Sequence, residues 1–204
     1  MNKKWTAQIF LLMFAGSLHA ASTEGAFLEV KNEVTLKAKT GEERATRVED
    51  PIHRGDTVRT GKKSRAEIEL SDKAIVRLGA HTIFSFDTER RELLIRQGEG
   101  LFAVPKGLKG TRISTPAATA AILGTTVYLK VAQTSTDYLC LEGKCQIGPH
   151  LLKPGDRITL PARSGYDSPI SHFDIRGFLK DNSLINDFAK PLPSLKLIEE
   201  EAGR

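Results

Sequence analysis

The chain has 204 residues, with 30 Lys and Arg against 25 Asp and Glu and a formal net charge of +5. This length argues against two full domains, although it allows one domain with a substantial core and a tail. Basic residues such as Arg44 and Lys62 are interleaved with acidic residues such as Glu42 and Glu67, whereas a nucleic-acid interface is usually clustered and of one sign. We therefore expect no nucleic-acid partner.

Residues 1–20 have the pattern of a secretory signal peptide. Lys3 and Lys4 precede an apolar run over residues 9–18, and small residues follow at 20–22. A membrane anchor is the alternative, but the run is shorter than the roughly 20 residues that a spanning helix needs. We predict export, cleavage between residues 20 and 22, a periplasmic or secreted location and no transmembrane segment in the mature chain.

Short alternating segments fill the region from Ala26 to about Leu160. In the stretch RAEIEL, residues 65–70, the apolar residues occupy one face and the charged residues the other, which is the period of a half-buried strand. Turn residues punctuate the segments at intervals typical of sandwiches and barrels. The pattern predicts an all-β domain over residues 26–161, either a twisted antiparallel β-sandwich or a short β-solenoid-like roll.

A weak internal repeat occurs in this region. The stretches IHRGDTVRT and LKPGDRITL share a Gly-Asp pair at matching positions, Gly55-Asp56 and Gly155-Asp156. Glycine would permit a turn, and aspartate would accept hydrogen bonds from backbone donors as the chain enters a strand. The triplet Arg54-Gly55-Asp56 is also a cell-adhesion motif, but the second copy lacks the arginine and favours a structural turn.

The stretch TPAATAAILGTTVYLKV, residues 115–131, permits three interpretations: a helix, a phosphate-binding loop or buried strands. Pro116 favours an extended Thr115 before it, and the β-branched residues from Thr125 onward suit a strand. A phosphate loop would need more glycines and a following helix. We predict two strand pieces that meet at Gly124.

The two cysteines, Cys140 and Cys145, flank Glu142-Gly143 in the stretch YLCLEGKCQI. A two-residue hairpin loop at Glu142-Gly143 would place the cysteines directly opposite each other, at a separation that permits a disulfide. Zinc is the alternative, but two cysteines without a nearby histidine pair fall short of four ligands. We predict a disulfide in an exported chain and no metal site.

After Pro169 the pattern changes. The stretch FDIRGFLKDNSLINDF has apolar residues at spacings near three and four, which predicts one broken helix or two short helices. The stretch PLPSLKLI is expected to be extended, followed by a polar terminus. Residues 162–204 are therefore predicted to be a C-terminal tail with a short helical segment.

No catalytic motif stands out in the sequence. The four histidines after the leader lie in different segments, and there is no Gly-x-Ser-x-Gly elbow. The acidic residues are expected on exposed strand faces and in turns, which does not suit a carboxylate pair with raised pKa values. We expect no catalytic residues and no cofactor.

The ordered series GDTVRTG, LLIRQGEGLFAVPKG, TRISTPAATAAILGTTVYLKV, LEGKCQI and LKPGDRITL resembles the FecR domain of periplasmic regulators of bacterial iron uptake. The resemblance covers residues 26–161 and rests on Gly55-Asp56, Thr115-Pro116, Gly124-Thr125 and Glu142-Gly143 in that order. The sequence of these stretches is similar to that of stand-alone exported FecR-domain proteins of Gram-negative bacteria. The family often has Arg before Gly-Thr, where this chain has Leu123.

FecR regulators pass an iron signal from an outer-membrane receptor to a cytoplasmic sigma factor through a cytoplasmic N-terminal segment and a membrane helix. Only residues 1–4 precede the apolar run here, so we expect the domain without that pathway. The resemblance implies a non-enzymatic envelope interaction or sensing module. The alternative is a carbohydrate-binding protein of the envelope or matrix, since a β-sandwich face can bind glycans with few sequence signs.

Overall fold

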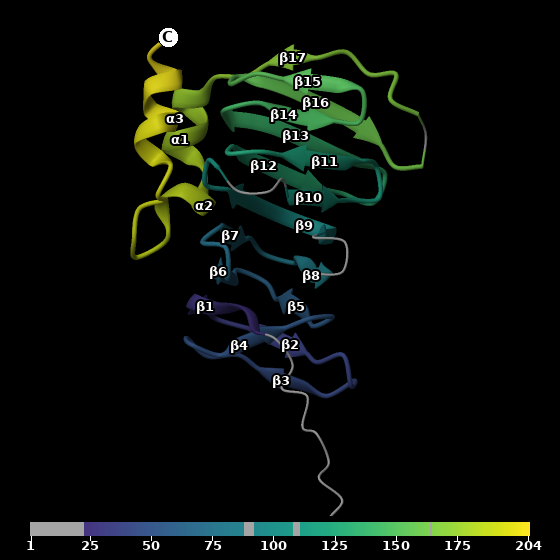
Figure 1. The fold of residues 1–204 in the computed structure, drawn as a ribbon, viewed down its shortest axis with the longest axis vertical. Coiled ribbons are helices and arrows are strands. Elements are labelled where there is room, and N and C mark those ends of the chain that lie inside the picture. The colour runs from purple at the N-terminus through teal and green to yellow at the C-terminus, as the bar shows by residue number, and fades with distance from the viewer. Residues whose placement is uncertain (1–22, 88–91, 108–110, 164) are drawn as a thin grey trace, which may run out of the picture.

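The computed structural model describes residues 23–87, 92–107, 111–163 and 165–204. The predicted signal peptide lies outside these residues. The described strands form an open mixed sheet that is folded into two facing layers, stacked from the N-terminal strands at the bottom of Figure 1 to the C-terminal strands at the top. In the part of the chain that the structure describes, no helix is long and apolar enough to span a bilayer.

The first layer, sheet A, is antiparallel throughout its described pairs. Its strands, in spatial order, are β4 (Pro51–His53), β1 (Thr23–Lys31), β6 (Arg65–Leu70), β7 (Ile75–Leu78), β9 (Glu92–Ala103), β12 (Thr126–Val131), β13 (Ser135–Glu142), β16 (Asp156–Pro161) and β17 (Ser171–His172).

The second layer, sheet B, is antiparallel except where β9 pairs with β10. Its strands, in spatial order, are β3 (Glu43–Ala45), β2 (Val34–Lys37), β5 (Thr57–Thr60), β8 (Ile83–Asp87), β9, β10 (Thr111–Ser114), β11 (Thr119–Ile122), β14 (Cys145–Ile147) and β15 (His150–Leu152).

Strand β9 belongs to both layers and joins them. Its first half, up to Gln97, pairs with β8 in sheet B, and its second half, from Gly98, pairs with β12 in sheet A. The main core lies between the layers and contains alternate residues of both, among them Phe27, Phe84 and Phe102. The predicted all-β class is therefore confirmed, as a two-layered roll.

Three helices follow the sheets: α1 (Ile175–Asp181), α2 (Ser183–Asn186) and α3 (Leu195–Ala202). The first two confirm the two short helices expected in this stretch, and the side chains of Asp174 and Asn182 cap them by accepting a backbone N–H. The expectation of an extended PLPSLKLI was wrong from Leu195 onward, because α3 begins there.

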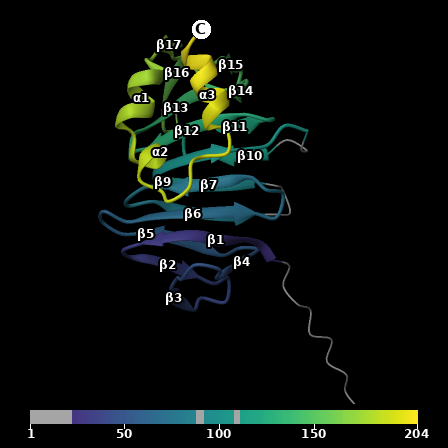
Figure 2. The same ribbon diagram turned by 90° about the vertical axis from the view of Figure 1, so that its left-hand side faces the viewer.

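The helices pack against the outer face of sheet A, as Figure 2 shows. Leu101, Tyr128 and Leu141 point outward from this sheet and form a second core with helix residues such as Leu184 and Ile198. Burying both faces of a strand removes more apolar surface from water than burying one face. The central strands of sheet A are therefore covered on both sides.

Candidate functional site

The two Gly-Asp motifs form the same turn at two places in the sandwich. Asp56 accepts a hydrogen bond from the backbone N–H of His53 at 2.9 Å, and Asp156 accepts one from Lys153 at 2.9 Å. The residue before each aspartate has a positive φ: Gly55 at +85° and Gly155 at +84°. Each aspartate is buried at the start of a strand, Asp56 directly before β5 and Asp156 as the first residue of β16, so the repeated sequence gives a repeated local structure.

The position of Asp56 also bears on the Arg-Gly-Asp triplet. Its second carboxylate oxygen accepts a hydrogen bond from the backbone N–H of Lys39 at 3.2 Å, and only 4% of the residue is exposed. A buried carboxylate that already accepts backbone hydrogen bonds is poorly placed to bind an external partner. The geometry supports a structural turn.

Thr115 and Pro116 form the turn between β10 and β11. The Thr115 hydroxyl accepts hydrogen bonds from the backbone N–H groups of Ala117 and Ala118, at 3.1 and 3.2 Å, and lies 2.6 Å from the hydroxyl of Tyr138 on β13. The turn in sheet B is therefore tied to sheet A through the core. Burial raises the pKa of Tyr138 to about 12.

Gly124 and Thr125 lie where the chain crosses from β11 in sheet B to β12 in sheet A. Gly124 has φ +63°, and a Cβ at this position would lie 2.8 Å from the Cα of Lys106, in the segment after β9. A side chain here would therefore meet backbone, in a conformation that favours glycine. The predicted meeting of two strands at Gly124 is what the structure contains, but the close neighbour is this segment and no strand.

Glu142 and Gly143 form a second corner beside the first. Strand β13 continues through Glu142 in sheet A, and β14 starts at Cys145 in sheet B. The predicted two-residue hairpin was therefore wrong, because the chain changes sheets here and β14 pairs with β11 and β15. A Cβ at Gly143 would lie 2.9 Å from the carbonyl oxygen of Gly124, so the two corners are in close contact.

Cys140 and Cys145 face each other across the core at this corner. Both are thiols in this structure, both are fully buried, and the Cys145 sulfur donates to the Cys140 sulfur at 2.6 Å. The Cys140 sulfur and then burial raise the pKa of the Cys145 thiol. The cysteines are neighbours between the sheets and not within a hairpin, and their disulfide stays a prediction.

Besides the two turn aspartates, two glutamates on strands are buried, contrary to the expectation that acidic residues would lie on exposed faces and turns. Glu142 is 4% exposed and pairs with Lys106 at 3.2 Å, beside a pocket of about 190 Å³ that reaches Pro193 on the C-terminal segment. Glu67 is 5% exposed and pairs with Arg77 at 2.6 Å. Each of these two buried glutamates has a cationic partner, which offsets the cost of removing its carboxylate from water.

Arg77 is fully buried on the outer face of sheet A and holds the C-terminal segment there. Its guanidinium donates to the carbonyl oxygens of Leu184, Ile185 and Lys190, at 2.9, 3.2 and 2.6 Å. It also lies 4.4 Å from the centroid of the Phe188 ring, a cation–π contact. This contact could not be predicted from the sequence, because a single arginine in an apolar strand resembles an exposed residue.

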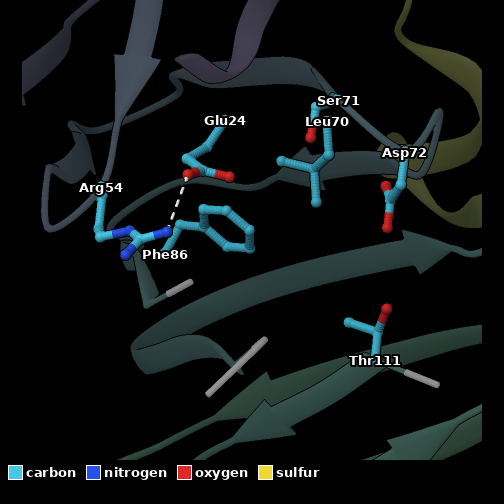
Figure 3. A pocket seen from close by; sticks show the side chains of 7 residues that line it. All are labelled: Glu24, Arg54, Leu70, Ser71, Asp72, Phe86 and Thr111. Atoms are coloured by element: carbon cyan, nitrogen blue, oxygen red, sulfur yellow. Dashed lines mark ion pairs between the residues drawn. The ribbon is translucent and has the colours of Figure 1, made fainter. Parts of the chain in front are cut away.

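A pocket of about 200 Å³ lies at one edge of the sandwich (Figure 3). Arg54 and Glu24 approach each other across it at 3.7 Å, while Leu70, Phe86 and Thr111 line the remaining wall. The charges of its lining are mixed, and the ion pair occupies part of the polar wall. The lining therefore does not favour one class of charged ligand.

The remaining titratable groups are dispersed. His150 contacts the carbonyl oxygen of Tyr166 at 2.7 Å, and His172 lies 2.9 Å from a carboxylate oxygen of Asp156 near the surface. Within residues 23–87, 92–107, 111–163 and 165–204, no three His, Cys, Asp or Glu side chains gather as metal ligands do.

The outer face of sheet B presents apolar side chains to solvent at its C-terminal end. Leu123 is 68% exposed and Leu151 is 48% exposed. The strand register places Ala121, Gln146 and Leu151 in one row across β11, β14 and β15. We call Ala121, Leu123, Gln146 and Leu151 the β11–β15 patch. A sheet face that exposes large apolar side chains beside polar ones is a candidate interaction surface.

Comparison with known families identifies the domain to which these corners and turns belong. Residues 56–146 match the family model described as FecR protein. This part of the chain resembles a FecR domain. The match begins at Asp56 and ends just after Cys145, so it includes Thr115-Pro116, Gly124-Thr125 and Glu142-Gly143.

The chain also has neighbours among solved structures. A proposed anti-sigma factor from Parabacteroides distasonis ATCC 8503, solved at 2.50 Å, is 18% identical with a TM-score of 0.50, over 64% of this chain and 71% of that chain. A second structure with the same description, solved at 1.65 Å, has the same identity and TM-score, over 71% and 74%. At this identity the likeness concerns the fold. No curated protein matches the chain significantly.

The structure gathers some of the sequence-predicted residues and separates others. Gly124, Thr125, Gly143 and the two cysteines meet at one corner of the FecR domain. Thr115-Pro116 and the two Gly-Asp turns lie elsewhere: Gly55-Asp56, for example, directly precedes β5 in sheet B, while Gly155-Asp156 leads into β16 in sheet A. The motifs are thus places where the chain turns or changes sheets.

Proposed function

We propose that this protein is an exported, non-enzymatic interaction or sensing module of the bacterial envelope. The observation that carries the proposal is the FecR match over residues 56–146. The leader pattern of residues 1–20 supports export to the periplasm or beyond. The description of the two structural neighbours as proposed anti-sigma factors supports a protein as the partner.

We place the partner on the β11–β15 patch. The patch includes residues of the FecR domain, lies on the layer opposite the helices, and presents Leu123 and Leu151 to solvent. Apolar side chains surrounded by polar ones, here Lys144 and Gln146, match the usual make-up of a protein interface. Binding at this patch would leave the C-terminal helices in place.

We further propose that Cys140 and Cys145 form a disulfide in the exported protein. Their sulfur atoms are adjacent in the core, and the compartments beyond the inner membrane are oxidising. Two thiols would lose two protons and two electrons to a disulfide-carrying oxidant, which would itself become a dithiol. The bond would tie sheet A to sheet B at the Gly124 corner.

Export is tested by cell fractionation and N-terminal sequencing of the tagged protein. We expect the protein in the periplasm or the medium, with a new N-terminus after one of residues 20–22. A full-length protein retained in the cytoplasm would contradict the proposal.

The partner is tested by cross-linking in cells, affinity purification and mass spectrometry, in parallel with a glycan array. We expect one dominant protein partner that is lost in Leu123→Asp/Leu151→Asp and kept in Val48→Asp, whose side chain is 52% exposed in a distant loop. Selective binding to a neutral glycan with no protein partner would contradict the proposal.

A further inference from the structure

A basic groove runs across the other half of sheet B. A hollow of about 300 Å³ is lined by Lys39, Arg54 and Arg96 together with the hydroxyl-bearing Thr57 and Ser85. These residues come from the loop after β2, the turn before β5, and strands β5, β8 and β9. The lining contains no acidic side chain among the described residues. The hollow therefore concentrates positive charge over polar groups.

A second, larger hollow of about 870 Å³ adjoins the first, because Arg96 lines both. It adds Arg163 and the polar residues Gln97, Gln133 and Thr134, and its described lining also lacks acidic side chains. Both hollows are shallow and open to solvent. Together they form one extended surface, which we call the basic groove, rather than an enclosed pocket for a small ion.

Two acidic residues near the basic groove, Asp56 and Glu24, already have partners. Asp56 lies two residues after Arg54 in the same turn, and its carboxylate accepts hydrogen bonds from the backbone N–H groups of His53 and Lys39. Glu24 pairs with Arg54 at 3.7 Å on the far side, in the pocket of Figure 3. Arg54 is thus partly neutralised. Lys39 and Arg96 are exposed, so their charges face solvent in the groove.

The lining of the basic groove matches one chemical class of ligand. Arginine and lysine bind carboxylate or sulfate groups through charge-assisted hydrogen bonds, while threonine, serine and glutamine side chains hydrogen-bond hydroxyl groups. An acidic polysaccharide carries both kinds of group, repeated along an extended chain. A single small anion would leave most of the groove unused.

We propose that the basic groove binds an acidic polysaccharide. This site is separate from the β11–β15 patch, so it does not depend on the proposed protein partner. Its occupant would touch β5, β8 and β9 together with the loops at one end of the sandwich. The positive charge would attract the polymer, and the hydroxyl and amide groups would select a sugar chain over other polyanions.

The test is binding of the purified protein to polygalacturonate, measured by biolayer interferometry at low and at physiological salt. Dextran serves as a neutral polymer and poly-glutamate as an acidic peptide. We expect binding to polygalacturonate that weakens with salt, and weaker binding to the other two polymers. Binding to poly-glutamate as tight as to polygalacturonate, or no binding to any polyanion, would overturn the proposal.

A pair of charge-matched variants tests where the polymer binds. Lys39→Gln/Arg96→Gln should weaken binding to polygalacturonate by about tenfold or more, because two charge-assisted contacts are lost. Lys180→Gln/Lys196→Gln removes the same charge from exposed positions on α1 and α3 and should change binding less than about twofold. Equal losses in the two variants would show that net charge alone attracts the polymer and would overturn the site. Circular dichroism checks that both variants are folded.

Discussion

The guanidinium of Arg77 donates a hydrogen bond to the carbonyl oxygen of Lys190 at 2.6 Å, joining a central strand of sheet A to a segment 113 positions later in the chain. With Glu67 beside it and two further carbonyl acceptors, this arginine satisfies a group of buried polar atoms. The C-terminal segment is therefore part of the folded unit, since Arg77 and the second core both hold it on the sheet.

Replacing Arg77 with Met should destabilise the protein by about 3–5 kcal/mol, because Glu67 would stay buried without its cation. Chemical unfolding measures the loss, and limited proteolysis should show cleavage between residues 182 and 194. Arg65→Met is the control, because Arg65 also bridges to this segment, at Asp187, but in a more exposed pair. Its cost should be about 1 kcal/mol or less. Similar losses in both variants would contradict the role given to Arg77.

The corner at Gly124 makes a second prediction. Gly124→Val should destabilise the protein by about 2–4 kcal/mol, because the side chain would meet the Lys106 backbone at a positive φ. Leu123→Arg should cost less than about 0.5 kcal/mol, because Leu123 is mostly exposed. Urea unfolding of both variants measures the change in unfolding free energy, provided that its dependence on urea concentration is the same as in the natural protein. The description of the corner fails if Leu123→Arg unfolds the domain while Gly124→Val is tolerated.

The sequence predicted the local features of this fold better than the long-range ones. Alternation in residues 65–70 placed Ala66, Ile68 and Leu70 on the core face, as observed, because that signal is local. At Glu142-Gly143 the sequence predicts a hairpin where the structure has a corner, because a turn that changes sheets has the same residues as a turn within one sheet. The register with β11 and β15 depends on contacts far along the chain.

The candidate sites were predictable to different degrees. The Gly-Asp turns and Gly124 could be read from the sequence, since few residue types suit those backbone conformations. Arg77 with Glu67 could not, because their burial depends on helices more than 100 residues away. The basic groove was also missed, because Lys39, Arg96 and Arg163 are isolated in the sequence and meet only in the folded structure.

The cysteine pair gives a third prediction. Protein purified from the periplasm should be about 2 Da lighter before reduction than after it, with no thiol open to alkylation in denaturant until a reductant is added. The disulfide should add about 2 kcal/mol of stability, since it closes a short loop. In the reduced native protein Cys145 should react slowly, because its raised pKa and burial disfavour the thiolate. Two free thiols in the periplasmic protein would rule out the bond.

A fourth prediction concerns alkaline pH. Tyr138 has a folded pKa of about 12 against about 10 in an unfolded chain, so the folded state retains a proton that the unfolded state loses. Its contribution to stability is intact below pH 10 and falls by roughly 1.4 kcal/mol per unit between pH 10 and 12. Burial also raises the pKa of Tyr128, which acts in the same direction.

Tyr138→Phe should therefore show a shallower alkaline decline than the natural protein, while losing about 1 kcal/mol at neutral pH with the hydrogen bond to Thr115. Chemical unfolding between pH 8 and 12 provides the comparison. An unchanged slope in Tyr138→Phe would refute the assignment.

Site-specific photo-cross-linking in living cells decides whether the proposed interaction module has a protein partner on the β11–β15 patch. A photoreactive amino acid is placed at Leu151 and, in a separate strain, at Val48, which is similarly exposed on a distant loop. We predict one discrete cross-linked protein from position 151 and none from position 48. The same set of cross-linked proteins from both positions, or no cross-linked protein from position 151, would show that the partner does not bind the β11–β15 patch.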